Sequence, residues 1–132
     1  MVEVYIDGAS AGNPGPSGAG VFINYKNGNV EHHSSYLGNI SNHEAEFAAL
    51  LLALKLCRER QIRMASFRTD SKLIEDAIEK KYINNKTYQH DLKEALSIIE
   101  SDFDLFFIKW IPSKQNQQAD QLARQAIQKK RK

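Results

Sequence analysis

Cysteine and long apolar runs are both scarce in this sequence. Cys57 is the only cysteine among 132 residues, so an internal disulfide is excluded and a reducing, intracellular compartment is expected. No apolar run is long enough to span a bilayer, and the N-terminus lacks the pattern of a secretory signal. These features predict a cytoplasmic protein without a membrane partner, and the length suits one domain.

Charge of one sign is also limited. The formal net charge is +2, and the final KKRK at residues 129–132 contributes +4, which leaves residues 1–128 at −2. A strongly basic body that binds nucleic acid through its overall charge is therefore excluded. We expect one domain at residues 1–128 and a disordered basic tail at residues 129–132, with weak affinity for polyanions.

Apolar periodicity predicts alternating strands and helices. The order β-β-β-α-β-α-α-β-α indicates a single α/β domain. Its five-stranded mixed sheet would contain three antiparallel strands and then parallel strands, flanked by helices. The expected strands are residues 2–7, 18–25, 30–38, 64–69 and 104–111, and the expected helices are residues 41–60, 70–81, 87–101 and 115–130.

Two acidic residues follow predicted strands, and each has two interpretations. Asp7 ends the first strand before a glycine-rich stretch, where it is either a turn residue or a ligand. Asp70 stands between a strand and a helix, where it is either the helix N-cap or part of a site. Strand ends in α/β sheets are where such sites gather.

Two further acidic residues lie within predicted helices. Glu46 interrupts the apolar run AEFAALLLAL, so it is either paired with a buried arginine or bound to a metal ion. Asp120 borders the apolar stripe of the last helix, where it is either a boundary residue of an amphipathic helix or part of a site. Four acids brought together repel one another, and divalent cations with oxygen preference relieve that repulsion. An all-carboxylate set is typical of two-metal phosphodiester cleavage.

Four ordered blocks carry a family resemblance: IDGASAGNPGPSGAG, NHEAEFAAL, RTDSKL and NQQADQLA. Together they resemble the signatures of type 1 ribonuclease H, over residues 2–127. The resemblance implies a ribonuclease H-like catalytic domain that hydrolyses the RNA strand of RNA/DNA hybrids and leaves 5′-phosphate and 3′-hydroxyl ends. It implies two Mg²⁺ or Mn²⁺ ions, and a monomer is the default assembly. The implied metal ligands and catalytic residues are Asp7, Glu46, Asp70 and Asp120.

The same resemblance places Gly12, Asn13, Ser41, Asn42 and His43 along the substrate. The glycine-rich loop would let the backbone approach the RNA strand. Ser41 either contacts a phosphate or caps the long helix with Glu44, whose spacing matches a capping box.

Three departures from the family pattern bear on activity. The loop PSKQNQQAD lacks the histidine found in many members, which leaves turnover open; Lys114, Gln115 or Asn116 could serve partly, although a plain polar loop is favoured. His43 stands where asparagine is common. The segment EKKYINNKTYQHD is short, and a solvated helix end is favoured over a small basic and aromatic patch of Lys80, Lys81, Tyr82, Lys86 and Tyr88.

Two alternative functions stay open on these grounds. One is a ribonuclease H-like module that binds nucleic acid and barely cuts it. The other is a nuclease of the same fold that acts on DNA or structured RNA.

Overall fold

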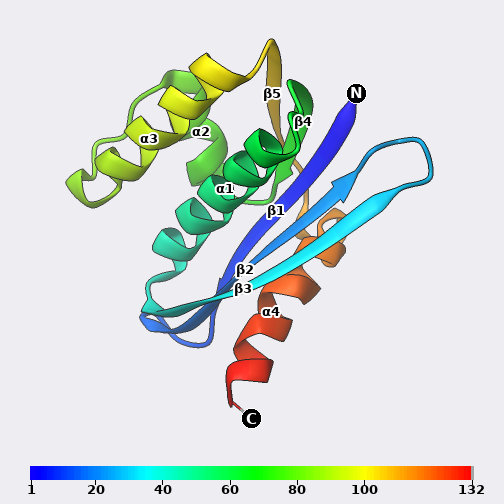
Figure 1. Ribbon diagram of the computed structural model, residues 1–132. Coiled ribbons are helices and arrows are strands. Elements are labelled where there is room, and N and C mark those ends of the chain that lie inside the picture. Colours follow the sequence, from blue (N-terminus) through cyan, green and yellow to red (C-terminus); the bar gives the residue numbers. More distant parts are fainter. Residues whose placement is uncertain (132) are drawn as a thin grey trace.

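The computed structural model describes residues 1–131, whose elements follow the order that the sequence predicts (Figure 1). The elements are β1 (Val2–Ser10), β2 (Gly15–Asn24), β3 (Val30–Ile40), α1 (Asn42–Glu59), β4 (Met64–Thr69), α2 (Lys72–Lys80), α3 (Lys86–Asp102), β5 (Leu105–Trp110), a 3-10 turn η1 (Ser113–Gln115) and α4 (Gln117–Arg131).

The strands form one mixed sheet in the order β3-β2-β1-β4-β5. The first three strands pair antiparallel, and β4 and β5 join them in parallel. The predicted five-stranded fold is thereby confirmed.

Strand β1 runs further than its apolar alternation predicts. Its parallel pairing with β4 ends at Ile6 and Thr69, but its antiparallel pairing with β2 continues to Ser10. Asp7 pairs with Gly20 and is therefore inside the strand, not at its end as predicted. Because β4 has already ended there, the β4 side of Asp7 is open to other side chains.

Gly8, which was assigned to the loop, and Gly20, which was predicted in a strand, both lie in strands and permit helices to approach closely. A Cβ atom on Gly8 would fall 2.2 Å from the backbone of Ala45 in α1. A Cβ atom on Gly20 would fall 2.0 Å from the carbonyl oxygen of Ala119 in α4. The loop itself covers only residues 11–14, where Gly12 has a φ of +117°. Helix packing therefore explains most of the small residues that were expected to serve substrate approach.

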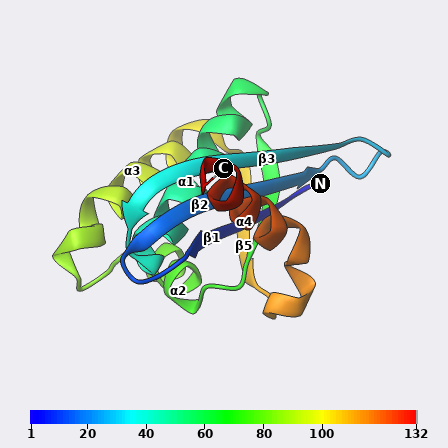
Figure 2. The same cartoon turned by 90° about the horizontal axis from the view of Figure 1, so that it is seen from below.

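Helices cover both faces of the sheet (Figures 1 and 2). Helix α1, backed by α3, packs on one face over a core that includes the fully buried Val4, Phe47 and Phe67. Helix α4 crosses the other face below β1, β2 and β3 (Figure 2). Its small apolar cluster joins Ala9 to Ala123 and Ile127. Because α1 and α4 flank β1 on opposite faces, acids on both helices can meet at one end of that strand.

Residues 129–131, where a disordered tail was expected, belong to helix α4. Helix α4 continues to Arg131, and the Lys130 ammonium lies 5.7 Å from the centre of the Tyr36 ring. Lys132 is outside the described residues. The helical pattern of α4 thus extends beyond residue 128.

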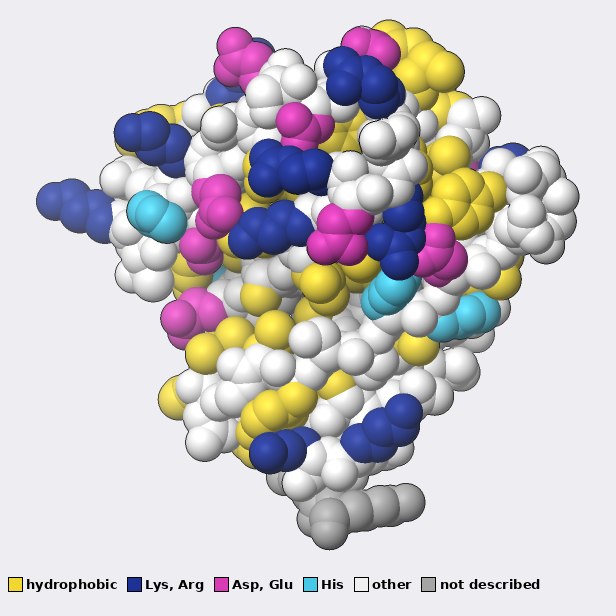
Figure 3. Space-filling model, viewed as in Figure 1, with side chains coloured by type: hydrophobic (Ala, Val, Ile, Leu, Met, Phe, Trp, Pro, Cys, Tyr) yellow, Lys and Arg dark blue, Asp and Glu magenta, His cyan; other side chains and the backbone are white. Residues whose placement is uncertain are grey.

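Acidic and basic side chains alternate on the face that carries α1 and α3, without a large patch of one sign (Figure 3). This distribution agrees with the near-neutral charge of the body. Among residues 1–131, no helix has the length and apolar character needed to cross a membrane.

Candidate active site

The four predicted acids line one cavity of about 460 Å³. They come from four places in the fold: β1, the first turns of α1, the junction of β4 and α2, and α4. The side chains that share the cavity are Asp7, Glu46, Asp70 and Asp120, together with Gly8, Ala9, Ser10, Asn42, Ser113 and Arg124.

Asp7 is the most deeply placed of these acids. Burial, followed by the neighbouring carboxylates of Asp70 and Asp120, raises its pKa to about 9. A carboxyl group with such neighbours favours either a bound proton or a bound cation. The repulsion expected from the sequence is therefore a property of the folded chain.

Asp70 directly follows β4 but does not cap α2. The N-cap is Ser71, whose hydroxyl oxygen accepts a hydrogen bond from the Ile74 amide at 3.2 Å. The carbonyl oxygen of Asp70 accepts a hydrogen bond from Trp110 Nε1 at 3.1 Å. The N-cap interpretation is thus wrong, and the backbone around Asp70 is fixed from both sides.

Glu46 lies on the first turns of α1, and only 18% of its side chain is exposed. Its partner is His43, one turn earlier, which donates from Nδ1 to Glu46 Oε1 at 2.7 Å. The expected buried arginine partner was wrong.

Asp120 is held by a residue that the sequence analysis did not single out. Arg124, one turn later in α4, donates from Nε to both carboxylate oxygens of Asp120 at 3.1 Å. The start of α4 is fixed by the buried Asn116, which donates from Nδ2 to the carbonyl oxygen of Ile6 at 2.9 Å. Asn116 therefore joins α4 to β1 beside Asp7. The acid-to-arginine spacing of four residues is a signal that could have revealed Arg124.

The donor set of the cavity fits divalent cations that prefer oxygen. All four acids offer carboxylate oxygens, and mutual repulsion around Asp7 favours a cation there. Among residues 1–131, however, no three of the four acids have ligand oxygens that all lie within 4.8 Å of one another. Asp7 has both Asp70 and Asp120 as close carboxylate neighbours. We call Asp7 and Asp70 the inner acids, and Glu46 and Asp120, which are bonded to His43 and Arg124, the outer acids.

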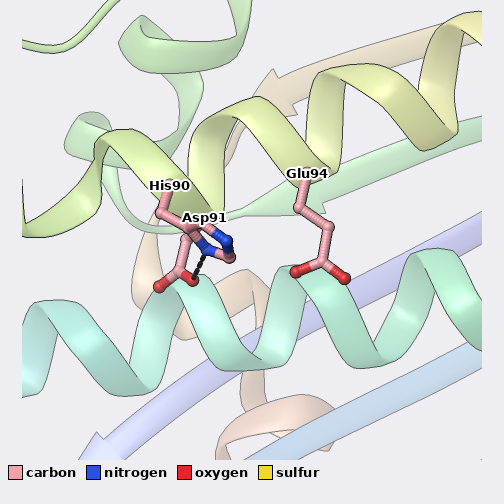
Figure 4. Close-up of side chains that lie close together, drawn as sticks. All are labelled: His90, Asp91 and Glu94. Carbon is pink, nitrogen blue, oxygen red and sulfur yellow. Dashed lines mark ion pairs between the residues drawn. The ribbon is translucent and has the colours of Figure 1, made fainter.

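A different acidic group lies on α3, outside this cavity (Figure 4). His90, Asp91 and Glu94 place one ligand atom each within 4.8 Å of the others. Glu94 also pairs with Lys55 of α1 at 3.2 Å, and the His90 side chain is 88% exposed. The sequence analysis did not predict this group, and an exposed helix surface commonly carries such residues.

Of the five predicted substrate residues, Asn42 lines the acidic cavity and His43 lines a neighbouring one. The Asn13 side-chain oxygen accepts a hydrogen bond from the Asn42 amide at 3.0 Å, which ties the β1–β2 turn to α1. Gly12 lies in that turn, and Asn42 lines the cavity. Ser41 caps α1 in a full capping box with Glu44. A phosphate contact of Ser41 stays a prediction.

A second cavity of about 420 Å³ adjoins the start of α1, between α2 and α3. It contains three members of the predicted basic and aromatic patch, Lys80, Tyr82 and Tyr88, together with His43. Tyr82 is exposed, whereas Tyr88 is buried and stacks on Phe47. Tyr88 therefore belongs to the core, which neither interpretation of this segment included. The choice between a solvated helix end and a small patch of the other residues stays a prediction.

Comparison with known proteins assigns the family. A family model described as reverse transcriptase-like matches residues 5–126, a range that contains all four acids. Ribonuclease HI of Halobacterium salinarum is 31% identical over 127 residues, which cover 96% of this chain and 64% of that protein. The chain is a reverse transcriptase-like member of the ribonuclease H family. The predicted family is confirmed, and ribonuclease H is its enzyme class.

Two solved structures and one further relative match nearly the whole chain. The crystal structure of LC11-RNase H1 in complex with an RNA/DNA hybrid has a TM-score of 0.93 at 29% identity and covers 100% of both chains. The crystal structure of RNase H1 from Halobacterium salinarum has a TM-score of 0.91 at 29% identity. The match covers 97% of this chain and 98% of that chain. EbsB of Enterococcus faecalis, named as a hydrolase without a stated substrate, is 42% identical over 131 residues, which cover 98% of this chain and 96% of that protein.

Proposed function

We propose that this chain is an endonuclease that hydrolyses the RNA strand of RNA/DNA hybrids. The observation that carries the proposal is the convergence of Asp7, Glu46, Asp70 and Asp120 on one cavity beside the β1–β2 turn. Support comes from the relationship to LC11-RNase H1, which was crystallised with such a hybrid.

The four acids would hold two Mg²⁺ or Mn²⁺ ions. Such ions lower the pKa of an attacking water and neutralise charge on the leaving oxygen of a phosphodiester. The chain supplies the carboxylate oxygens and fixes their backbones through Asn116 and Trp110. Hydrolysis of this kind leaves 5′-phosphate and 3′-hydroxyl ends.

Residues at the mouth of the cavity would orient the hybrid. The bond between Asn13 and Asn42 holds the β1–β2 turn against α1, so both segments present polar groups next to the acids. Gly12 leaves the turn without a side chain at its second residue, where the RNA backbone and its 2′-hydroxyl groups could approach. His43 lies beyond them toward the second cavity.

One feature favours a second candidate, a module that binds hybrids and barely cuts them. The segment from Pro112 to Asp120, which contains η1, has no histidine. Asn116, which was considered as a substitute, is buried and bonded to Ile6. A complete set of four acids argues against this candidate, because acids placed near phosphates would oppose binding unless cations are bound.

The deciding experiment measures cleavage of a labelled RNA/DNA hybrid with Mg²⁺ or Mn²⁺. Single-stranded RNA of the same sequence and a matching DNA duplex are the substrate controls. Asp70→Asn tests the cavity, and Asp91→Asn in the α3 group is the matched control. Hybrid-selective cutting that is lost only in Asp70→Asn is the expected result.

Other results would favour the alternatives. Hybrid binding without cutting in either metal, by folded protein, would favour the binding module. Equal cutting of duplex DNA would favour a nuclease of different specificity. Loss of cutting in Asp91→Asn instead of Asp70→Asn would move the metal site to α3.

A further inference from the structure

His43 makes two contacts that together fix its imidazole ring. On one side, Nδ1 donates to Glu46 Oε1 at 2.7 Å. On the other side, the ring meets Tyr88 edge to face, with centroids 6.1 Å apart and planes at 82°. Just over half of the His43 side chain is exposed, so these contacts, and not burial, orient it.

The support behind Tyr88 reaches the hydrophobic core. The Tyr88 ring is buried and stacks on Phe47, with centroids 5.2 Å apart and planes at 17°. Phe47 is fully buried beneath α1. A continuous set of ring contacts therefore runs from the core through Tyr88 to His43, and it ends at the Glu46 carboxylate.

His43 also separates the two cavities. Glu46 lines the acidic cavity, and His43 and Tyr88 line the neighbouring cavity between α2 and α3. Because His43 bonds only to Oε1 of Glu46, the other oxygen of that carboxylate is left for the acidic cavity. A hydrogen bond to one oxygen restricts the rotation of the carboxylate without occupying both oxygens.

We propose that His43 is a positioning residue that orients Glu46 and thereby raises the affinity of the acidic cavity for divalent cations. The inference rests on the proposed function, because it takes Glu46 as a metal ligand. Groups that hold a metal ligand by hydrogen bonds fix its orientation, and their loss typically weakens metal binding about 10- to 100-fold. If His43 only contacted the substrate, its loss would not weaken metal binding in the absence of nucleic acid.

The test measures Mn²⁺ binding by titration calorimetry, without nucleic acid. His43→Leu removes the donor and is expected to weaken the tightest Mn²⁺ site about tenfold. His43→Gln keeps a donor that reaches toward Glu46 and should restore most of the affinity. His43→Asn has the same amide on a shorter side chain and should bind less tightly than His43→Gln.

Two more variants separate positioning from general effects. Tyr88→Leu removes the ring that supports His43 and should weaken Mn²⁺ binding less than His43→Leu does. His32→Leu, at an exposed histidine on β3, should leave Mn²⁺ binding unchanged. Thermal unfolding without metal checks that each variant is folded.

Unchanged or tighter Mn²⁺ binding in His43→Leu would overturn the proposal, and so would equal affinities in the Gln and Asn variants. If His43→Leu does not fold, the Gln and Asn pair decides alone. Metal binding that follows the expected pattern without hybrid cleavage would refute the proposed function and leave the inference standing. A wild-type protein that binds no Mn²⁺ would refute both.

Discussion

The inner and outer acids of the cavity differ in what surrounds them. Asp7 faces Asp70, and burial with neighbouring carboxylates raises the pKa of Asp7 to about 9. Glu46 and Asp120 each have a nitrogen donor one turn away, His43 and Arg124. Asp7 is therefore the centre of the repulsion that a cation relieves, and Asp120 contributes to it as Asp70 does, while Glu46 and Asp120 are also held by donors of the chain. The four ligands are unequal before any metal binds.

The difference between inner and outer acids should be largest in the rate of hybrid cleavage. Asp7→Asn or Asp70→Asn should lower single-turnover hybrid cleavage about 10³-fold, because the charge that attracts the ions is lost. Asp120→Asn should lower the single-turnover cleavage rate about tenfold, because the asparagine amide keeps one oxygen at this outer ligand position. Equal losses at all three positions would mean that the inner and outer acids are equivalent.

At Asp7, the same substitution that lowers the cleavage rate should raise the free energy of unfolding measured without metal. Asp7→Asn removes a carboxyl group that must take up a proton on folding at neutral pH, so the free energy of unfolding in chelator should rise by about 1–2 kcal/mol. Glu46→Gln, at the acid that is bonded to His43, serves as the control. Urea unfolding in chelator measures both variants, and a destabilised Asp7→Asn would contradict the repulsion at the centre of the cavity.

The pH dependence of that stability has a definite sign. The raised pKa means that folded Asp7 keeps a proton that unfolded Asp7 releases at a pKa near 3.8. Between these values, the free energy of unfolding without metal should fall as pH rises, by about 2–3 kcal/mol from pH 6 to pH 8. Asp7→Asn should flatten this dependence. A wild-type protein that becomes more stable over this window would show that Asp7 is ionised throughout.

The identities of the four acids could be predicted from the sequence, but the contact that orients the partner of Glu46 could not. Ordered motifs place Asp7, Glu46 and Asp70 on separate elements, and parallel strands bring such positions together. That His43 bonds to Glu46 depends on side-chain orientation, which Tyr88 fixes from a distant helix. A contact between residues far apart in sequence leaves no local periodic signal.

The extent of β1 and the roles of Gly8 and Gly20 also depend on contacts that the sequence pattern does not reveal. Apolar alternation stops at Ile6, so the pattern ends the strand there, but backbone pairing with β2 continues without it. Gly8 resembles a loop residue in sequence because glycine commonly marks turns, whereas Gly20 falls in a predicted strand without a visible reason for glycine. Their steric role becomes visible only when Ala45 and Ala119 of the packed helices are in place.

The smallest expected effect distinguishes the two outer acids from each other. His43 bonds to one oxygen of Glu46, whereas Arg124 bonds to both oxygens of Asp120. We therefore expect Arg124 to compete with a cation for Asp120, so Arg124→Gln should tighten Mn²⁺ binding a few-fold. The lost ion pair is partly exposed and should lower the free energy of unfolding by only about 0.3–0.5 kcal/mol. Titration calorimetry beside His43→Leu makes the comparison direct: weaker binding in both variants would mean that Arg124 also orients its carboxylate.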